Sequence, residues 1–140
     1  MTELFSLGSE GWGDEMLRGA LMTVLVSASS LLLGIVIGII FAACKLSNIF
    51  LLKLIANIYT TIIRGIPELL VIYLLFFGGS GAVMYVAKIF GYNGYIELNA
   101  FTIGTIAVGA ISGAYSTEVI RGAVNAVPKG QFEAGKTLGL

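Results

Sequence analysis

The part of this chain that most resembles a chemical site is its last eleven residues, GQFEAGKTLGL. Gly130, four further residues and then Gly135-Lys136-Thr137 match the G-x-x-x-x-G-K-[ST] pattern of a phosphate-binding loop. In such a loop, backbone N–H groups surround the phosphates of a nucleotide while the lysine and the hydroxyl complete the site. The match indicates a nucleotide-hydrolysing enzyme only if a strand precedes the loop and a helix follows it.

Other catalytic chemistry has little support in the sequence. The chain has no histidine, and its one cysteine, Cys44, reads as a small packing residue at the end of an apolar run. No cluster of cysteines or carboxylates has the spacing of metal ligands. We therefore expect no catalytic residue, no metal, no cofactor and no nucleic-acid partner.

The composition is that of a membrane protein. Of the 140 residues, 57% are apolar and 11% are charged, and the mean hydropathy is +0.96, too apolar for a soluble core of this size. The charge-free stretches are Gly19–Cys44, Leu69–Ala87 and Leu98–Thr117. Each is long enough to span a hydrocarbon core of ~30 Å, and none alternates as a barrel strand would. We predict an all-α membrane protein with three transmembrane helices, at about residues 19–44, 68–88 and 98–120.

The distribution of Lys and Arg predicts the orientation, because these residues gather in cytoplasmic loops. The cytoplasmic candidates, between the first two spans and after the third, are Lys45, Lys53, Arg64, Arg121, Lys129 and Lys136. The opposite side has only Arg18 and Lys88. This places the N-terminus outside and the C-terminus in the cytoplasm. Residues 1–18 are then an outer interfacial segment, with a frayed terminus as the alternative, and residues 91–98 are an external loop.

Two patterns indicate how the helices pack and bend. Small residues recur every fourth position, which favours close helix–helix contact within the chain or with another subunit. They are Ser30, Gly34, Gly38 and Ala42 in the first span, and Thr105, Gly109, Gly113 and Thr117 in the third. Apolar residues at helical spacing over 51–63 predict another helix, and Gly65 and Pro67 predict a break after it.

Glu68 and Glu118 are the carboxylates nearest the apolar spans. Charges near the hydrocarbon are costly and are often paired or functional. Arg64 precedes Glu68 by four residues and Arg121 follows Glu118 by three, spacings that favour local ion pairs. We expect such pairs, and keep both carboxylates as candidates for a transport path. Three further candidates lie deeper on the last helix, with ordinary packing as the alternative: Ser112, Tyr115 and Ser116.

The surroundings of the phosphate-loop motif argue against a nucleotide site. The end of a membrane helix and then Pro128-Lys129 precede it, where a strand is required, and three residues follow Thr137. Glu133 would also place a carboxylate among the phosphates. We therefore interpret the motif as a chance match.

Two longer segments carry a resemblance instead. Residues 59–70, TTIIRGIPELL after Tyr59, and residues 114–134, AYSTEVIRGA followed by VPKGQFEA, resemble the polar amino-acid permeases of binding-protein-dependent ABC importers. The resemblance runs from about residue 17 to 140, and the two motifs at this separation are specific. It implies that residues 19–140 are the N-terminal part of a type I ABC importer permease fold in the bacterial inner membrane.

The resemblance also implies a role for the tail. The family pattern Glu-Ala-Ala, three residues, Gly corresponds here to Glu133-Ala134-Gly135 and Gly139, with Gly135 replacing the second alanine. We expect residues 133–138 to form a short helix that docks on a separate ATPase, with Glu133 in its first turn and Gly139 ending it in a left-handed conformation. The coupling loop would cover residues 128–140 and include Gly130.

The implied partners are a cytoplasmic ABC ATPase, a second permease subunit (identical or different), an external substrate-binding protein and the lipid bilayer. Glu68 after the Arg-Gly-Ile-Pro turn resembles the histidine, lysine-arginine-ornithine and opine permeases, which favours a basic amino acid or an opine as cargo. Because members of the family continue beyond this loop, we expect the 140 residues to be the N-terminal half to two-thirds of a permease. The alternatives are a non-transporting membrane fragment or an accessory subunit that packs through its small-residue stripes.

Overall fold

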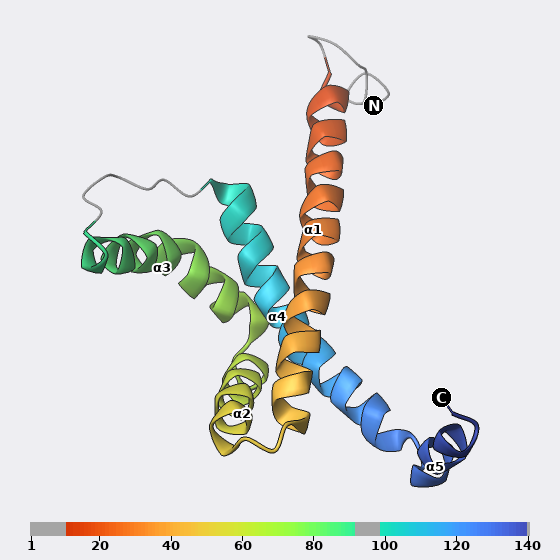
Figure 1. Ribbon diagram of the computed structural model, residues 1–140. Helices are drawn as coiled ribbons and strands as arrows, with labels where there is room; N and C mark the ends of the chain where they lie inside the picture. The colour runs from red at the N-terminus through yellow and green to blue at the C-terminus, as the bar shows by residue number, and fades with distance from the viewer. Residues whose placement is uncertain (1–10, 92–98, 140) are drawn as a thin grey trace.

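The computed structural model describes residues 11–91 and 99–139, and its secondary structure there is entirely helical (Figure 1). The helices are α1 (Gly13–Leu46), α2 (Phe50–Gly65), α3 (Glu68–Ile89), α4 (Ala100–Ala126) and α5 (Lys129–Thr137). The predicted all-α class is confirmed. Residues 1–10 of the predicted interfacial segment and residues 92–98 of the predicted external loop lie outside the described residues.

Helices α1 and α4 are each long and apolar enough to cross a membrane. At 1.5 Å per residue, the 34 residues of α1 extend about 51 Å and the 27 residues of α4 about 40 Å. A third span exists only if α2 and the first part of α3 count together, although they are bent by 108° at the break between them. The described chain therefore has two candidate spans, or three with the bent pair, rather than three separate straight ones.

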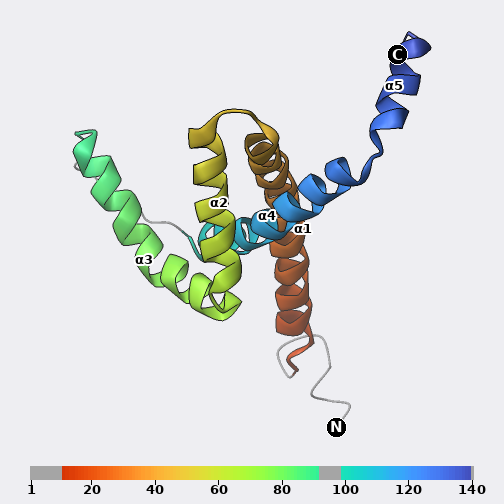
Figure 2. The ribbon, with the colours of Figure 1, turned by 90° about the horizontal axis from the view of Figure 1, so that it is seen from below.

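The chain's two prolines end α2 and α4. Ile66 before Pro67 has φ −104° and ψ 142°, and Val127 before Pro128 has φ −73° and ψ 119°. The proline ring disfavours a helical conformation in the residue before it, so the helix stops there, and each proline then caps the next helix. Figures 1 and 2 show α2 returning beside the C-terminal half of α1, and α3 turning away from both.

The most extensive contact in the molecule is between α1 and α4. Its centre is the predicted stripes of small residues, which face each other within the chain. The buried members are Ser30, Gly34, Gly38 and Ala42 on α1, and Gly109, Gly113, Ala114 and Thr117 on α4. A Cβ atom added at Gly34 would lie 2.7 Å from the Cβ of Ser112, and one at Gly38 would lie 2.6 Å from the Cβ of Ser116. The absence of side chains at these glycines is what lets the two helices approach.

Away from this interface the surface is apolar. The accessible surface is 10281 Å², against about 6,900 Å² for a water-soluble monomer of the same mass. Large apolar side chains are exposed along α1, α2 and α3, among them Leu32, Ile58 and Phe77. Such a surface requires lipid or further helices around it.

Helix α5 is detached from the other helices and stands at the far end of α4 (Figures 1 and 2).

Candidate functional site

The tail forms a longer helix than the sequence predicted. Helix α5 begins at Lys129, directly after Pro128, and ends at Thr137, so Gly130 lies inside it. The expectation that Glu133 lies in the first turn is wrong, because the proline starts the helix four residues earlier and the first turn has no acidic residue. Gly139 has φ +78°, the left-handed conformation expected at the end of this helix.

The same helix excludes phosphate-loop geometry. Residues Gly130 to Thr137 are helical, so their backbone groups belong to the helix instead of a loop around an anion. The Thr137 hydroxyl donates to the Ala134 carbonyl at 2.7 Å, and α4 precedes the motif where a strand is needed. The chance match inferred from the surrounding sequence therefore has a structural reason.

The surface of α5 is available for contact. Glu133 and Ala134 are exposed, Gly135 is half-buried, and Phe132 is 58% exposed. Gly130, Glu133, Ala134 and Thr137 share one face at helical spacing, where two of the four positions have little or no side chain. Gly130 and Ala134 make this face flat, and Glu133 adds one carboxylate to it. Such a face is suited to close contact with another protein.

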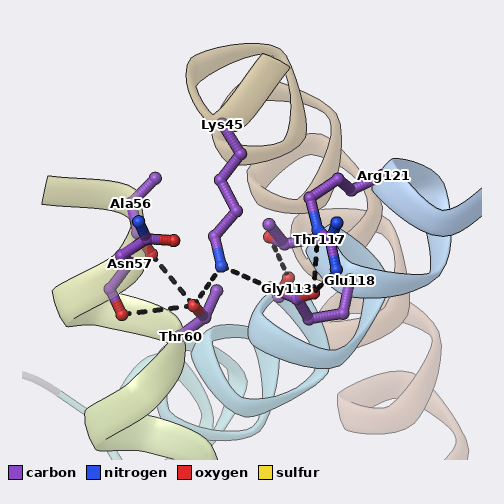
Figure 3. Close-up of polar contacts among 8 residues, drawn as sticks. All are labelled: Lys45, Ala56, Asn57, Thr60, Gly113, Thr117, Glu118 and Arg121. Atoms are coloured by element: carbon purple, nitrogen blue, oxygen red, sulfur yellow. Dashed lines mark hydrogen bonds and ion pairs between the residues drawn. The ribbon is translucent and has the colours of Figure 1, made fainter. Parts of the chain in front are cut away.

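A polar junction joins side chains of α1, α2 and α4 (Figure 3). Lys45, at the end of α1, donates to a carboxylate oxygen of Glu118 on α4 and, at 2.6 Å, to the Thr60 hydroxyl on α2. The other Glu118 oxygen accepts from Arg121 at 2.8 and 3.0 Å. The Lys45 side chain is 9% exposed and that of Glu118 19%, so water contributes little to their solvation. We name these four residues the polar junction.

The polar junction confirms one sequence expectation and adds a partner. The Glu118–Arg121 pair is present as predicted from its spacing. Lys45 was not identified as a partner, because 73 residues separate it from Glu118 and no local pattern connects them. Its place at the end of a long apolar run was the available signal, since a lysine there must reach either water or a carboxylate.

The expected ion pair between Arg64 and Glu68 is not found. Arg64 ends α2 and Glu68 begins α3, and the 108° bend between the helices removes the helical spacing on which the expectation rested. Glu68 is exposed. The Arg64 guanidinium lies over the ring of Tyr115 instead, 5.4 Å from its centroid, which is cation–π geometry.

Ser112 and Ser116 lie where α4 meets the glycines of α1, and both are half-buried. Their contacts with Gly34 and Gly38 are packing contacts, and their role in a transport path stays a prediction. With Tyr115 and Ile35 they also border an open depression of about 380 Å³ between α1 and α4. Tyr115, Ser112 and Ser116 are therefore close together, whereas Glu68 lies at the helix break and Glu118 in the polar junction.

Tyr59 makes a further polar contact, which was not predicted from the sequence. Its hydroxyl donates to the Ala110 carbonyl of α4 at 2.5 Å, and its ring stacks on Phe41 of α1 with centroids 4.4 Å apart. One side chain of α2 thus contacts both long helices. Among the described residues, no group of three His, Cys, Asp or Glu side chains is placed to hold a metal ion.

Comparison with known proteins agrees with this arrangement. The model of the family described as binding-protein-dependent transport system inner membrane component matches residues 34–140. This chain belongs to that family. The resemblance drawn from the two sequence motifs is thereby confirmed, together with the predicted inner-membrane location.

Individual relatives are similar over nearly the whole chain. The nopaline transport system permease protein NocQ of Agrobacterium fabrum is 52% identical over 98% of this chain, which corresponds to 58% of the relative. The octopine transport system permease protein OccQ of Rhizobium meliloti is 44% identical over 99% of this chain and 58% of its own length. The histidine/lysine/arginine/ornithine permease protein HisQ of Escherichia coli is 43% identical over 92% of this chain and 56% of its own.

A solved structure shares the fold. The crystal structure of an amino acid ABC transporter with histidines aligns with a TM-score of 0.66 and 31% identity, over 90% of this chain and 56% of that one. The chain therefore spans a little under three-fifths of the relatives it matches.

Proposed function

We propose that the chain is the membrane-spanning permease subunit of an ATP-driven, binding-protein-dependent importer of polar amino acids. The relatives named for nopaline, octopine and the histidine/lysine/arginine/ornithine system support a basic amino acid or an opine as cargo. In this proposal the chain catalyses no reaction, and a separate cytoplasmic ATPase hydrolyses ATP. An external binding protein delivers the cargo, and a second permease subunit completes the path.

Helix α5 is the observation that carries the proposal. It is short, exposed and detached from the other helices, and it begins and ends at residues that fix its length, Pro128 and Gly139. These features support a coupling element that docks on the ATPase through Gly130, Glu133, Ala134, Gly135 and Gly139. The surplus of Lys and Arg on the same side supports a cytoplasmic C-terminus and an external N-terminus.

The polar junction supports a route from α5 into the membrane. Glu118 lies on α4, the helix that leads to α5, and binds Lys45 of α1, which in turn binds Thr60 of α2. A displacement of α5 would therefore be transmitted through these contacts to α4, α1 and α2. We assign Glu118 to this transmission, and Glu68, Ser112, Tyr115 and Ser116 to the region through which the cargo passes.

The accessory-subunit alternative loses its main support. It required the small-residue stripes to be free for a larger complex, but the stripes of α1 and α4 are buried against each other. An accessory subunit that only packs against other helices also gives no reason for the exposed helix α5 after Pro128.

The test uses the complete transporter, expressed with its ATPase and its binding protein. Glu133→Lys is expected to abolish co-purification of the ATPase, or cargo-stimulated ATP hydrolysis in proteoliposomes. Gln131→Lys, which places the same charge on another face of α5, serves as the control and is expected to retain both. Equal behaviour of the two variants, or a wild-type permease that captures no ATPase, would refute the proposal.

A further inference from the structure

The break between α2 and α3 lies inside the bent pair of helices that can form the third span. Helix α2 has 16 residues, about 24 Å, and runs back beside α1 from the turn at residues 47–49 (Figures 1 and 2). A hydrocarbon core is only about 30 Å thick. An α2 that enters this core at one surface therefore ends inside it, short of the opposite surface.

A cation lies at this break. Arg64 is in the last turn of α2, and within the described part of the chain its guanidinium makes no ion pair: the recorded pairs belong to Glu118 alone. Glu68 begins the next helix, yet the bend keeps it from pairing with Arg64. A charge inside the bilayer is costly unless it is satisfied, and such residues mark ligand sites or ion pairs. Broken helices near the midplane are also where transporters place their substrates.

Among the residues that the structure describes, none hydrogen-bonds to the Arg64 guanidinium. Stacking over Tyr115 uses the face of the guanidinium, while its N–H donors lie in the plane. That planar fork matches the two oxygens of a carboxylate. Tyr115 also borders the open depression of about 380 Å³ lined by Ser112 and Ser116, so the stacked Arg64 lies next to one of its walls.

We propose that Arg64, held on Tyr115 at the helix break, binds the carboxylate of the transported amino acid or opine. The inference rests on the proposed importer function and adds the residue that recognises the acidic group common to both cargo classes. It differs from the assignment of Glu68, whose negative charge suits the cationic part of a basic cargo. The two opposite charges at the break are unpaired with each other and so remain available to a zwitterion.

The test measures direct binding to the purified permease–ATPase complex without the binding protein, which would add its own selectivity. The probes are L-arginine and nopaline. Each is compared with the derivative in which the α-carboxyl group of its arginine part is a carboxamide. The wild-type complex is expected to prefer the carboxylates by roughly 10- to 100-fold, as for loss of a hydrogen-bonded charge pair. Arg64→Gln is expected to remove that preference by weakening the carboxylates alone. Lys53→Gln, which removes a cation from the same helix nearer its start, is the control and keeps the preference.

The outcomes separate the two proposals. If Arg64→Gln weakens acids and amides equally, or changes neither, the carboxylate site is refuted while ATPase capture and cargo binding by the wild type still support the importer. If the wild-type complex captures no ATPase and binds neither probe, the importer proposal fails first. Should the glutamine variant not fold, Arg64→Lys keeps the charge but not the planar fork. It is expected to show an intermediate preference, and an unchanged one would overturn the inference.

Discussion

Substitution of Gly38 by alanine tests the packing on which the fold depends. A Cβ atom at this position would lie 2.6 Å from the Cβ of Ser116 and 3.3 Å from the backbone of Ser116 and Thr117. Pairs of carbon atoms are most stable at about 3.5–4.0 Å, so α1 and α4 must separate by about 1 Å. Because backbone atoms are among the neighbours, a change of side-chain rotamer does not relieve the contact.

The magnitude follows from two opposing terms. A radial gap of about 1 Å forfeits up to about half of the dispersion attraction between the atoms concerned, and overpacking costs about 1–3 kcal/mol. Replacing a helical glycine by alanine returns up to about 1 kcal/mol. Gly19→Ala on the same helix contributes only the second term, because nothing lies within 4 Å of its added Cβ. The difference between the two variants therefore isolates the interface, with an expected value of about 1–3 kcal/mol.

The assay is titration with sodium dodecyl sulfate of the purified protein in mixed micelles, followed by circular dichroism. Gly38→Ala should unfold at a lower detergent fraction than the wild type, and Gly19→Ala at the same or a higher one. Gly38→Leu should lower the midpoint further, because the extra carbons have no space. Equal midpoints for Gly38→Ala and Gly19→Ala would refute the close α1–α4 contact.

Three further predictions concern the polar contacts and the tail. Glu118→Gln and Lys45→Met should each lower the free energy of unfolding by about 1.5–3 kcal/mol, since each removes one charge of a largely buried ion pair, although Glu118 keeps Arg121 when Lys45 is replaced. In the same titration the double variant should lose less than the sum by at least about 1 kcal/mol, and strict additivity would contradict the ion pair. Tyr59→Phe should cost about 1 kcal/mol by removing the bond to Ala110 while keeping the stack on Phe41, and no change would argue against that bond. The isolated chain should show no saturable binding of a fluorescent ATP analogue, whereas binding that Lys136→Ala abolishes would restore the phosphate-loop interpretation.

Features set by local chemistry could be predicted from the sequence. The stripes of Ser30 to Ala42 and Thr105 to Thr117 predicted a close helix contact, and Gly65 and Pro67 predicted the break after α2. The sequence could not say that the stripes face each other, because α2 and α3 intervene and small residues are equally suited to another subunit.

The candidate site shows the same division. The pair of Glu118 and Arg121 follows from spacing on one helix, but Lys45 comes from another helix and needed the fold. Arg64 and Glu68 have equally good spacing, yet the bend at Pro67 separates them. For Glu133, the expected helix start was taken from a family pattern, whereas Pro128 sets the actual start. Spacing rules hold only where one helix is continuous.

The α1–α4 contact also constrains how the protein is made. Ala42 and Thr117 lie 75 positions apart in the sequence, so the first stripe leaves the ribosome well before its partner. At roughly 5–20 residues per second, synthesis of the intervening segment takes about 4–15 s. During that interval α1 is inserted with its glycine face open to lipid or to other newly made helices. Membrane biogenesis of this chain must therefore either tolerate an unpaired α1 for seconds or protect it until α4 arrives.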